Sequence, residues 1–199
     1  MSDSLDYYLL TGPAGVLVEE FTRDADGATT GLKAAIWSVA GPRWRAAASF
    51  GLLMRTDKAQ LARATPVARA AAADAFRQFG GGDLPAEDEL RAELTDFAPL
   101  ASAPPLRLGP SGDANRHYRV LFAKDPRPEP PAGLASGSRR IGADAYSWKL
   151  RRVGNGIGWA LDVTAGLAGP PGTVEPLLRE LTAALRAHGL IPVTTERFS

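Results

Sequence analysis

YSWKLRRVGNGIGWALDVT, residues 146–164, is the stretch that decides the fold class of this chain. Asn155-Gly156 at its centre favours the tight turn of a β-hairpin, because both turn positions require positive φ. Such a turn places Lys149 directly opposite Asp162, an opposite-charge pair across two antiparallel strands. Because successive strand residues point to opposite faces, the sequence predicts a hairpin with one polar face and one buried face. The buried face is expected to carry Trp148, Leu150, Trp159, Leu161 and Val163.

The residues after this hairpin predict a helix and a final strand. Thr173 is a suitable N-cap for a helix over 174–188, and Gly189 follows as the glycine that commonly ends a helix. Leucines recur at helical spacing between them and are expected to face the core. A strand over 190–197 then completes a strand–helix–strand unit, which predicts a crossover that returns the chain to the same sheet.

The first 55 residues predict a β meander. Strands are expected over 7–10, 16–22 and 32–39, with turns rich in glycine between them. From Trp44 to Met54, apolar residues alternate with polar ones over eleven positions, which predicts a fourth, half-buried strand. A helix is the competing interpretation for this segment, because its run of alanines from Ala46 to Ala48 favours a helix.

Three helices are expected next. Asp57 can cap a short one over 58–63, and Thr65 followed by Pro66 is a typical start for a second one over 67–79. Asp83 is expected to cap a third helix, which carries acids in its first turn, where the helix dipole stabilises negative charge. The buried side of that helix is expected to carry Leu90, Leu94 and Phe97.

The predicted fold class is therefore α+β, with a mostly antiparallel sheet formed by the N-terminal meander and by the C-terminal hairpin–helix–strand unit, packed with about three helices. The 199 residues can form one compact domain, with two lobes as an alternative: 1–98, with the meander and helices, and 115–199, with the hairpin–helix–strand unit. Many of the prolines lie between residues 99 and 131, which predicts long loops over 99–114 and 124–140.

The composition argues against several kinds of chemistry. The chain has no cysteine, so disulfides, thiol nucleophiles and thiolate metal sites are absent, and a reducing, cytoplasmic location is expected. It has two histidines. His188 ends the predicted helix, where a cation meets the negative end of the dipole, and His117 has no recognisable catalytic partner beside it. The glycine-rich segments lack the context of a phosphate-binding loop, so the sequence indicates neither cofactor nor metal.

The charges, by contrast, are unevenly distributed. Residues 83–96 contain six acids and one arginine, whereas residues 107–152 contain ten basic residues and four acids, although the whole chain has a net charge of only +1. Arginine is enriched and lysine depleted at protein interfaces. One interpretation of this charge pattern is a solvated surface without a partner. Another is a protein-binding surface, whose candidate residues are Arg107, Arg116, Arg119, Arg127, Arg139, Arg140 and Arg151. His117 and Tyr118 are separate candidates, for a pocket.

The predicted function is non-catalytic binding, as an adaptor, chaperone or assembly component that engages another protein or a second copy of itself. A small-molecule enzyme or ligand-binding protein with a cleft near His117 is the alternative. Binding of a nucleic-acid backbone is a second alternative, which the scarcity of lysine disfavours. No apolar run of membrane-spanning length occurs in the sequence, so no membrane partner is expected.

Overall fold

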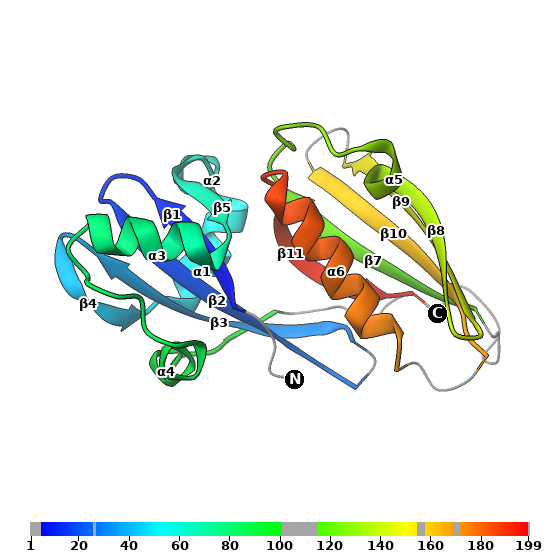
Figure 1. The fold of residues 1–199 in the computed structure, drawn as a ribbon, viewed down its shortest axis with the longest axis horizontal. Coiled ribbons are helices and arrows are strands. Elements are labelled where there is room, and N and C mark those ends of the chain that lie inside the picture. The colour runs from blue at the N-terminus through cyan, green and yellow to red at the C-terminus, as the bar shows by residue number, and fades with distance from the viewer. Residues whose placement is uncertain (1–4, 26, 101–114, 155–157, 169–171, 199) are drawn as a thin grey trace. The chain divides into compact units, whose positions relative to one another are not determined.

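The computed structural model describes residues 5–25, 27–100, 115–154, 158–168 and 172–198. It has an α+β fold, as the sequence predicts, with two antiparallel sheets (Figure 1). The chain divides into two compact units. Unit 1 comprises residues 1–22 and 30–100, and unit 2 comprises residues 23–29 and 101–199.

The sheet of unit 1 has the strand order β4-β3-β2-β1-β5, and the short β6 pairs with β3. Its first three strands form the predicted meander. The strands are β1 (Asp6–Leu10), β2 (Gly15–Arg23), β3 (Thr29–Ser38), β4 (Gly41–Ala46), β5 (Ala64–Val67) and β6 (Ala98–Pro99).

Both faces of this sheet are covered. Tyr7 and Tyr8 are neighbours on β1 and so point to opposite faces, yet both are buried. On the face of Tyr7, Phe76 and Leu90 complete a core with the sheet, and Figure 1 shows α3 lying across that side. The helices of unit 1 are α1 (Ala48–Thr56), α2 (Lys58–Arg63), α3 (Arg69–Gln78) and α4 (Glu87–Glu93).

The strand predicted from Trp44 to Met54 is wrong over most of its length. β4 ends at Ala46, and α1 begins at Ala48. The buried residues of α1 include Ala48, Gly51 and Met54, which are spaced by three as on a helical face. In an alanine-rich segment, periods of two and of three to four fit the same residues, and the high helix propensity of alanine decides for the helix.

The helix start predicted at Thr65 and Pro66 is also wrong. Both residues lie in β5, the strand at the end of the sheet order, which pairs with β1. An edge strand tolerates proline because the missing N–H removes no hydrogen bond to a second neighbour. The helix predicted over 67–79 instead begins at Arg69 and ends at Gln78.

The other two helices of unit 1 agree with the sequence more closely. The Asp57 carboxylate accepts hydrogen bonds from the backbone N–H groups of Ala59 and Gln60 in the first turn of α2, which confirms it as the cap. In the third predicted helix, α4, the N-cap is Ala86, so the predicted cap Asp83 is wrong, and the helix runs from Glu87 to Glu93. Because the helix stops there, the expected stripe is not continued: Leu90 and Leu94 are buried, but Phe97 is 51% exposed and its predicted burial is wrong.

The sheet of unit 2 has the order β11-β7-β10-β9-β8, with α6 packed on one face. Figure 1 shows α6 running across this sheet. The elements are β7 (Asn115–Ala123), α5 (Ala132–Ala135), β8 (Ser136–Ile141), β9 (Asp144–Val153), β10 (Gly158–Gly166), α6 (Val174–Ala187) and β11 (Ile191–Arg197).

The predicted hairpin register is confirmed. Lys149 is the partner of Asp162 and Arg152 is the partner of Trp159 in the β9–β10 pairing. Trp148 is buried and Lys149 is exposed, so the two faces are assigned correctly. Trp159, however, is only partly buried, and its expected full burial is wrong. The residues Asn155 and Gly156 of the predicted turn lie outside the described residues.

The helix and last strand of unit 2 confirm the predicted unit. α6 ends at the C-cap His188, and Gly189 follows with a φ of 88°. β11 joins the same sheet through β7, as the predicted crossover requires. The apolar side of α6 packs on the buried side chains of three strands. This core includes Tyr118, Val120, Phe122, Trp148, Leu150, Leu161, Val163, Leu177, Leu181 and Leu185.

The two segments predicted as loops differ from the prediction. Residues 124–140 contain α5 and most of β8, whose pairing with β9 gives the segment a regular structure. In the other segment, Pro99 belongs to β6, and residues 101–114 lie outside the described residues. Within the described ranges, no helix combines the length and the apolar character needed to cross a membrane.

Candidate functional site

The five-stranded sheet of unit 2 has one face covered by α6 and one face that carries polar side chains. On β9, the buried Trp148 and Leu150 alternate with the exposed Ser147, Lys149 and Arg151. We call the side of these exposed residues the open face. Partners in the strand register share a face, so the register assigns its other polar members, which are Asn115, His117, Arg119, Ser136, Ser138, Arg140, Asp162, Thr164, Thr194 and Glu196.

Side chains on the open face form two rows across the strands. In the first row, Lys149, Asp162, Arg119 and Glu196 follow one another on adjacent strands, so that the sign of the charge alternates. The second row is Ser138, Ser147, Thr164 and His117. Because adjacent strands lie about 4.8 Å apart, these groups are presented at regular intervals on a fixed support.

Asp162 lies at the centre of the charged row and holds two arginines. Its Oδ1 accepts a hydrogen bond from Arg119 Nε at 2.5 Å, and its Oδ2 accepts one from Arg151 Nε at 2.6 Å. The sequence correctly placed Lys149 opposite Asp162, but these ion pairs are with the arginines. Burial alone would raise the pKa of Asp162, but the hydrogen bonds and positive charges of Arg119 and Arg151 lower it. Asp162 is therefore a firmly ionised anchor.

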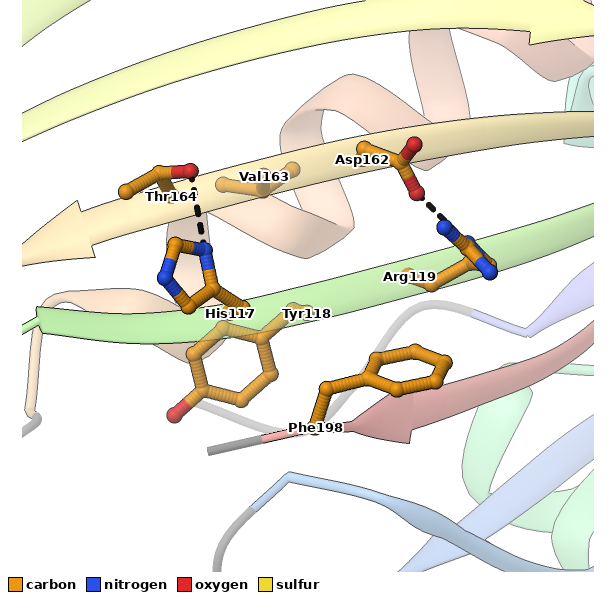
Figure 2. Close-up of a pocket in the computed structure, with 7 residues that line it drawn as sticks. All are labelled: His117, Tyr118, Arg119, Asp162, Val163, Thr164 and Phe198. Atoms are coloured by element: carbon orange, nitrogen blue, oxygen red, sulfur yellow. Dashed lines mark hydrogen bonds and ion pairs between the residues drawn. The ribbon is translucent and has the colours of Figure 1, made fainter. Parts of the chain in front are cut away.

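A hollow of about 340 Å³ lies beside this ion pair (Figure 2). It is lined by His117, Tyr118, Arg119, Asp162, Val163, Thr164 and Phe198. His117 Nδ1 lies 3.1 Å from Thr164 Oγ1, and the Arg119 guanidinium lies over the Phe198 ring, 4.8 Å from its centre. Since ligand pockets usually measure about 300–1,000 Å³, the hollow has room for a side chain or a small molecule.

The seven predicted arginines do not form one surface. Arg119, Arg140 and Arg151 belong to the open face, whereas Arg139 lies on the opposite side of β8. There, Arg139 donates two hydrogen bonds to the Glu180 carboxylate of α6, at 2.7 and 2.8 Å. The remaining three lie elsewhere. Arg116 is half-buried on β7, Arg127 is exposed beyond the end of β7, and Arg107 lies outside the described residues.

Sequence reasoning missed part of this site. The polar side of the hairpin, with Lys149 and Arg151, was recognisable from the alternation in β9. The pairing of β7 with β10 was not, because the two strands lie far apart in sequence. That pairing brings His117 and Arg119 to Thr164 and Asp162. Phe198 had no signal at all in the sequence. Both expected pocket residues, His117 and Tyr118, line the hollow, Tyr118 from a buried position.

The two histidines make different contacts. His117 is exposed beside Thr164, while His188 Nδ1 lies 3.0 Å from the Pro128 carbonyl oxygen at the C-terminal end of α6. No group of three or more histidine or carboxylate side chains in the described part of the chain gathers as metal ligands would. The chemistry that the open face offers is therefore that of hydrogen-bond donors and positive charges, from His117 and from its arginine and lysine side chains.

No protein-family model, curated protein or solved structure matches this chain. The open face itself therefore provides the functional signal. It carries four basic side chains, Lys149, Arg119, Arg140 and Arg151, against two carboxylates, Asp162 and Glu196, which leaves two net positive charges.

Proposed function

We propose that this chain is a non-catalytic binding protein whose open face in unit 2 engages a partner protein with an acidic surface. The observation that carries the proposal is the excess positive charge on an exposed, regular sheet face. Arg140 and Lys149 are exposed there, and neither forms an ion pair with any residue that the structure describes. Carboxylates of a partner can reach both cations without disturbing Asp162.

The arrangement of charge favours a protein over a nucleic acid. A nucleic-acid backbone presents a continuous line of phosphates and is bound by correspondingly strong positive potential. The open face instead alternates in sign, and its carboxylates, Asp162 and Glu196, would repel phosphates. Protein surfaces mix both signs, so a mixed row with a small positive excess suits a protein whose charges are complementary.

Site-specific photocrosslinking in the cell tests this proposal. The photoreactive residue p-benzoylphenylalanine replaces Ser147, which is exposed on the open face, and in a second variant Ala92, which is exposed on α4. We expect Ser147→p-benzoylphenylalanine to crosslink to a protein with an acidic surface, and Ala92→p-benzoylphenylalanine not to crosslink to it. When Arg140→Glu and Lys149→Glu are introduced into the Ser147→p-benzoylphenylalanine variant, the crosslink should be lost.

The matched control is the double substitution Arg43→Glu/Arg127→Glu, which changes the net charge equally at two exposed positions that do not belong to the open face. It should leave the crosslink intact. A crosslink from Ser147→p-benzoylphenylalanine to nucleic acid, or one that joins two copies of this chain, would contradict the proposed partner. Equal crosslinking from both positions would contradict the proposed surface.

A further inference from the structure

The Arg119 guanidinium is held in place at the wall of the hollow. Asp162 accepts from its Nε at 2.5 Å, and the central carbon of the guanidinium lies over the Phe198 ring, 4.8 Å from the ring centre. Nε is the only guanidinium nitrogen of Arg119 that hydrogen-bonds to the residues described by the structure. The two terminal nitrogens thus keep their donors for another group, on a side chain whose orientation is already fixed.

His117 supplies a second donor. When the Thr164 hydroxyl donates to Nδ1, the neutral imidazole carries its proton on Nε2. The ring is exposed, so this N–H is accessible from solvent. The Phe198 backbone N–H donates to the His117 carbonyl oxygen at 2.8 Å, which ties the aromatic wall to the strand that carries both donors. Figure 2 shows these side chains around the hollow.

The charge of the hollow fits a group with one negative charge. Three cations, Lys149, Arg119 and Arg151, lie around two carboxylates, Asp162 and Glu196, so one net positive charge remains beside the hollow. A carboxylate carries one negative charge, whereas phosphate groups carry up to two at neutral pH. Phe198 lines the same hollow, and its ring can contact the apolar carbons next to a carboxylate.

We infer that this hollow is a carboxylate-binding site, in which Arg119 and His117 hold the carboxylate and Phe198 contacts the carbon chain attached to it. The inference rests on the proposed function, because it assumes that the bound carboxylate belongs to the acidic partner protein. A free small carboxylate has the same chemistry, and the experiment separates the two sources.

The test uses the full chain and a charge-neutral double variant, Arg119→Gln/Asp162→Asn, which removes one charge of each sign and leaves the net charge of the open face unchanged. The matched control is Arg152→Gln/Asp125→Asn, which removes an exposed ion pair with a 2.9 Å contact elsewhere in unit 2. One probe is a fluorescein-labelled peptide of ten glutamates. The other is glutarate, whose binding is detected by the NMR chemical shifts of the backbone amides of residues 117, 119 and 164.

We expect Arg119→Gln/Asp162→Asn to weaken peptide binding about tenfold, because a charge-assisted hydrogen bond is lost, and the control to change it less than about twofold. The single variant His117→Ala, which removes the donor at an exposed position, should also weaken binding while retaining the fold. Glutarate should shift the three amides and compete with the peptide.

One outcome would overturn the inference and leave the proposed function standing. In that outcome, Arg140→Glu/Lys149→Glu weakens peptide binding, but Arg119→Gln/Asp162→Asn does not. Glutarate shifts without any peptide binding would support the carboxylate site, with a small molecule as its source, and overturn the proposed protein partner. Shifts of these amides with inorganic phosphate but not with glutarate would overturn the carboxylate assignment.

Discussion

Arg55 and Glu19 form a two-pronged ion pair in the interior of unit 1. Arg55 Nη1 donates to Glu19 Oε1 at 3.0 Å and Nη2 donates to Oε2 at 2.7 Å, while the side chains are 2% and 0% exposed. Nη1 also donates to the Gly51 carbonyl oxygen. Burial alone would lower the pKa of Arg55, but the charge of Glu19 and its hydrogen bonds raise it. Arg55 therefore keeps its charge between α1 and the sheet.

The first prediction concerns this buried pair. Arg55→Ala should lower the free energy of unfolding by about 3–5 kcal/mol, because it leaves Glu19 buried without its partner. The double variant Glu19→Leu/Arg55→Met should lose far less, since it removes both charges and retains most of the volume. Arg77→Ala is the control. The Arg77 side chain forms ion pairs but is 59% exposed, so this substitution should lower the free energy of unfolding by less than about 1 kcal/mol. Urea unfolding measures all three, and a large loss in the double variant would contradict this account.

The second prediction concerns the alkaline pH dependence of stability. Burial, partly opposed by the hydrogen bond from Arg69, raises the pKa of Tyr7 from 10.0 to about 12. The folded state therefore keeps the Tyr7 proton at a pH where the unfolded chain loses it, so stability falls as the pH rises from 10 toward 12. Between pH 9 and pH 11, the wild type should lose about 1–1.5 kcal/mol more than Tyr7→Phe. Equal losses in urea unfolding would show that Tyr7 does not contribute.

The third prediction separates two tryptophans of the same hairpin. Trp148 is 8% exposed, and its Nε1 donates to the Gly133 carbonyl oxygen, whereas Trp159 is partly buried and stacks with the Arg152 guanidinium. Trp148→Ala should cost about 3–5 kcal/mol of unfolding free energy, as is typical for a core tryptophan. Trp159→Ala should cost less, because part of its surface already contacts water. A reversed order in chemical unfolding would refute the burial of the two side chains.

The hairpin illustrates what the sequence can predict. Its register follows from a local turn and from alternation in two adjacent strands, so Lys149 and Asp162 could be placed opposite each other before the structure was known. α6 was equally clear, because leucines at helical spacing and Gly189 agree on its length. In both cases all the information lies within about twenty neighbouring residues.

The failures have physical reasons of two kinds. At Pro66 and at Ala48, the local pattern permits two structures. Pro66 lies in an edge strand, which tolerates proline. At Ala48, both periods fit the alanine-rich segment, and the helix propensity of alanine decides. The hollow fails for a different reason. His117 and Thr164 are 47 residues apart in the sequence and are brought together by the pairing of β7 with β10. The alternation of polar and apolar residues within one strand carries no information about which distant strand pairs with it.

The fourth prediction compares two adjacent arginines, Arg139 and Arg140, which were assigned from the sequence to the same binding surface. Arg139→Glu places a carboxylate against Glu180 and removes the stacking on Trp148, so it should lower the melting temperature and leave binding of acidic peptides intact. Arg140→Glu changes an exposed residue of the open face, so it should weaken peptide binding and leave the melting temperature nearly unchanged. Thermal unfolding and peptide titration of both variants check this, and the opposite assignment would place the binding surface on the α6 side.

The most direct test of the central claim is a titration of the full chain with the fluorescein-labelled peptide of ten glutamates, at two salt concentrations. Arg140→Glu/Lys149→Glu and the control Arg43→Glu/Arg127→Glu change the net charge of the protein by the same amount, but only the first changes the open face. We predict that the first weakens binding about tenfold and the control less than about twofold, with a larger difference at low salt. Equal weakening by the two variants would mean that net charge alone attracts the peptide, and would contradict a binding site on the open face.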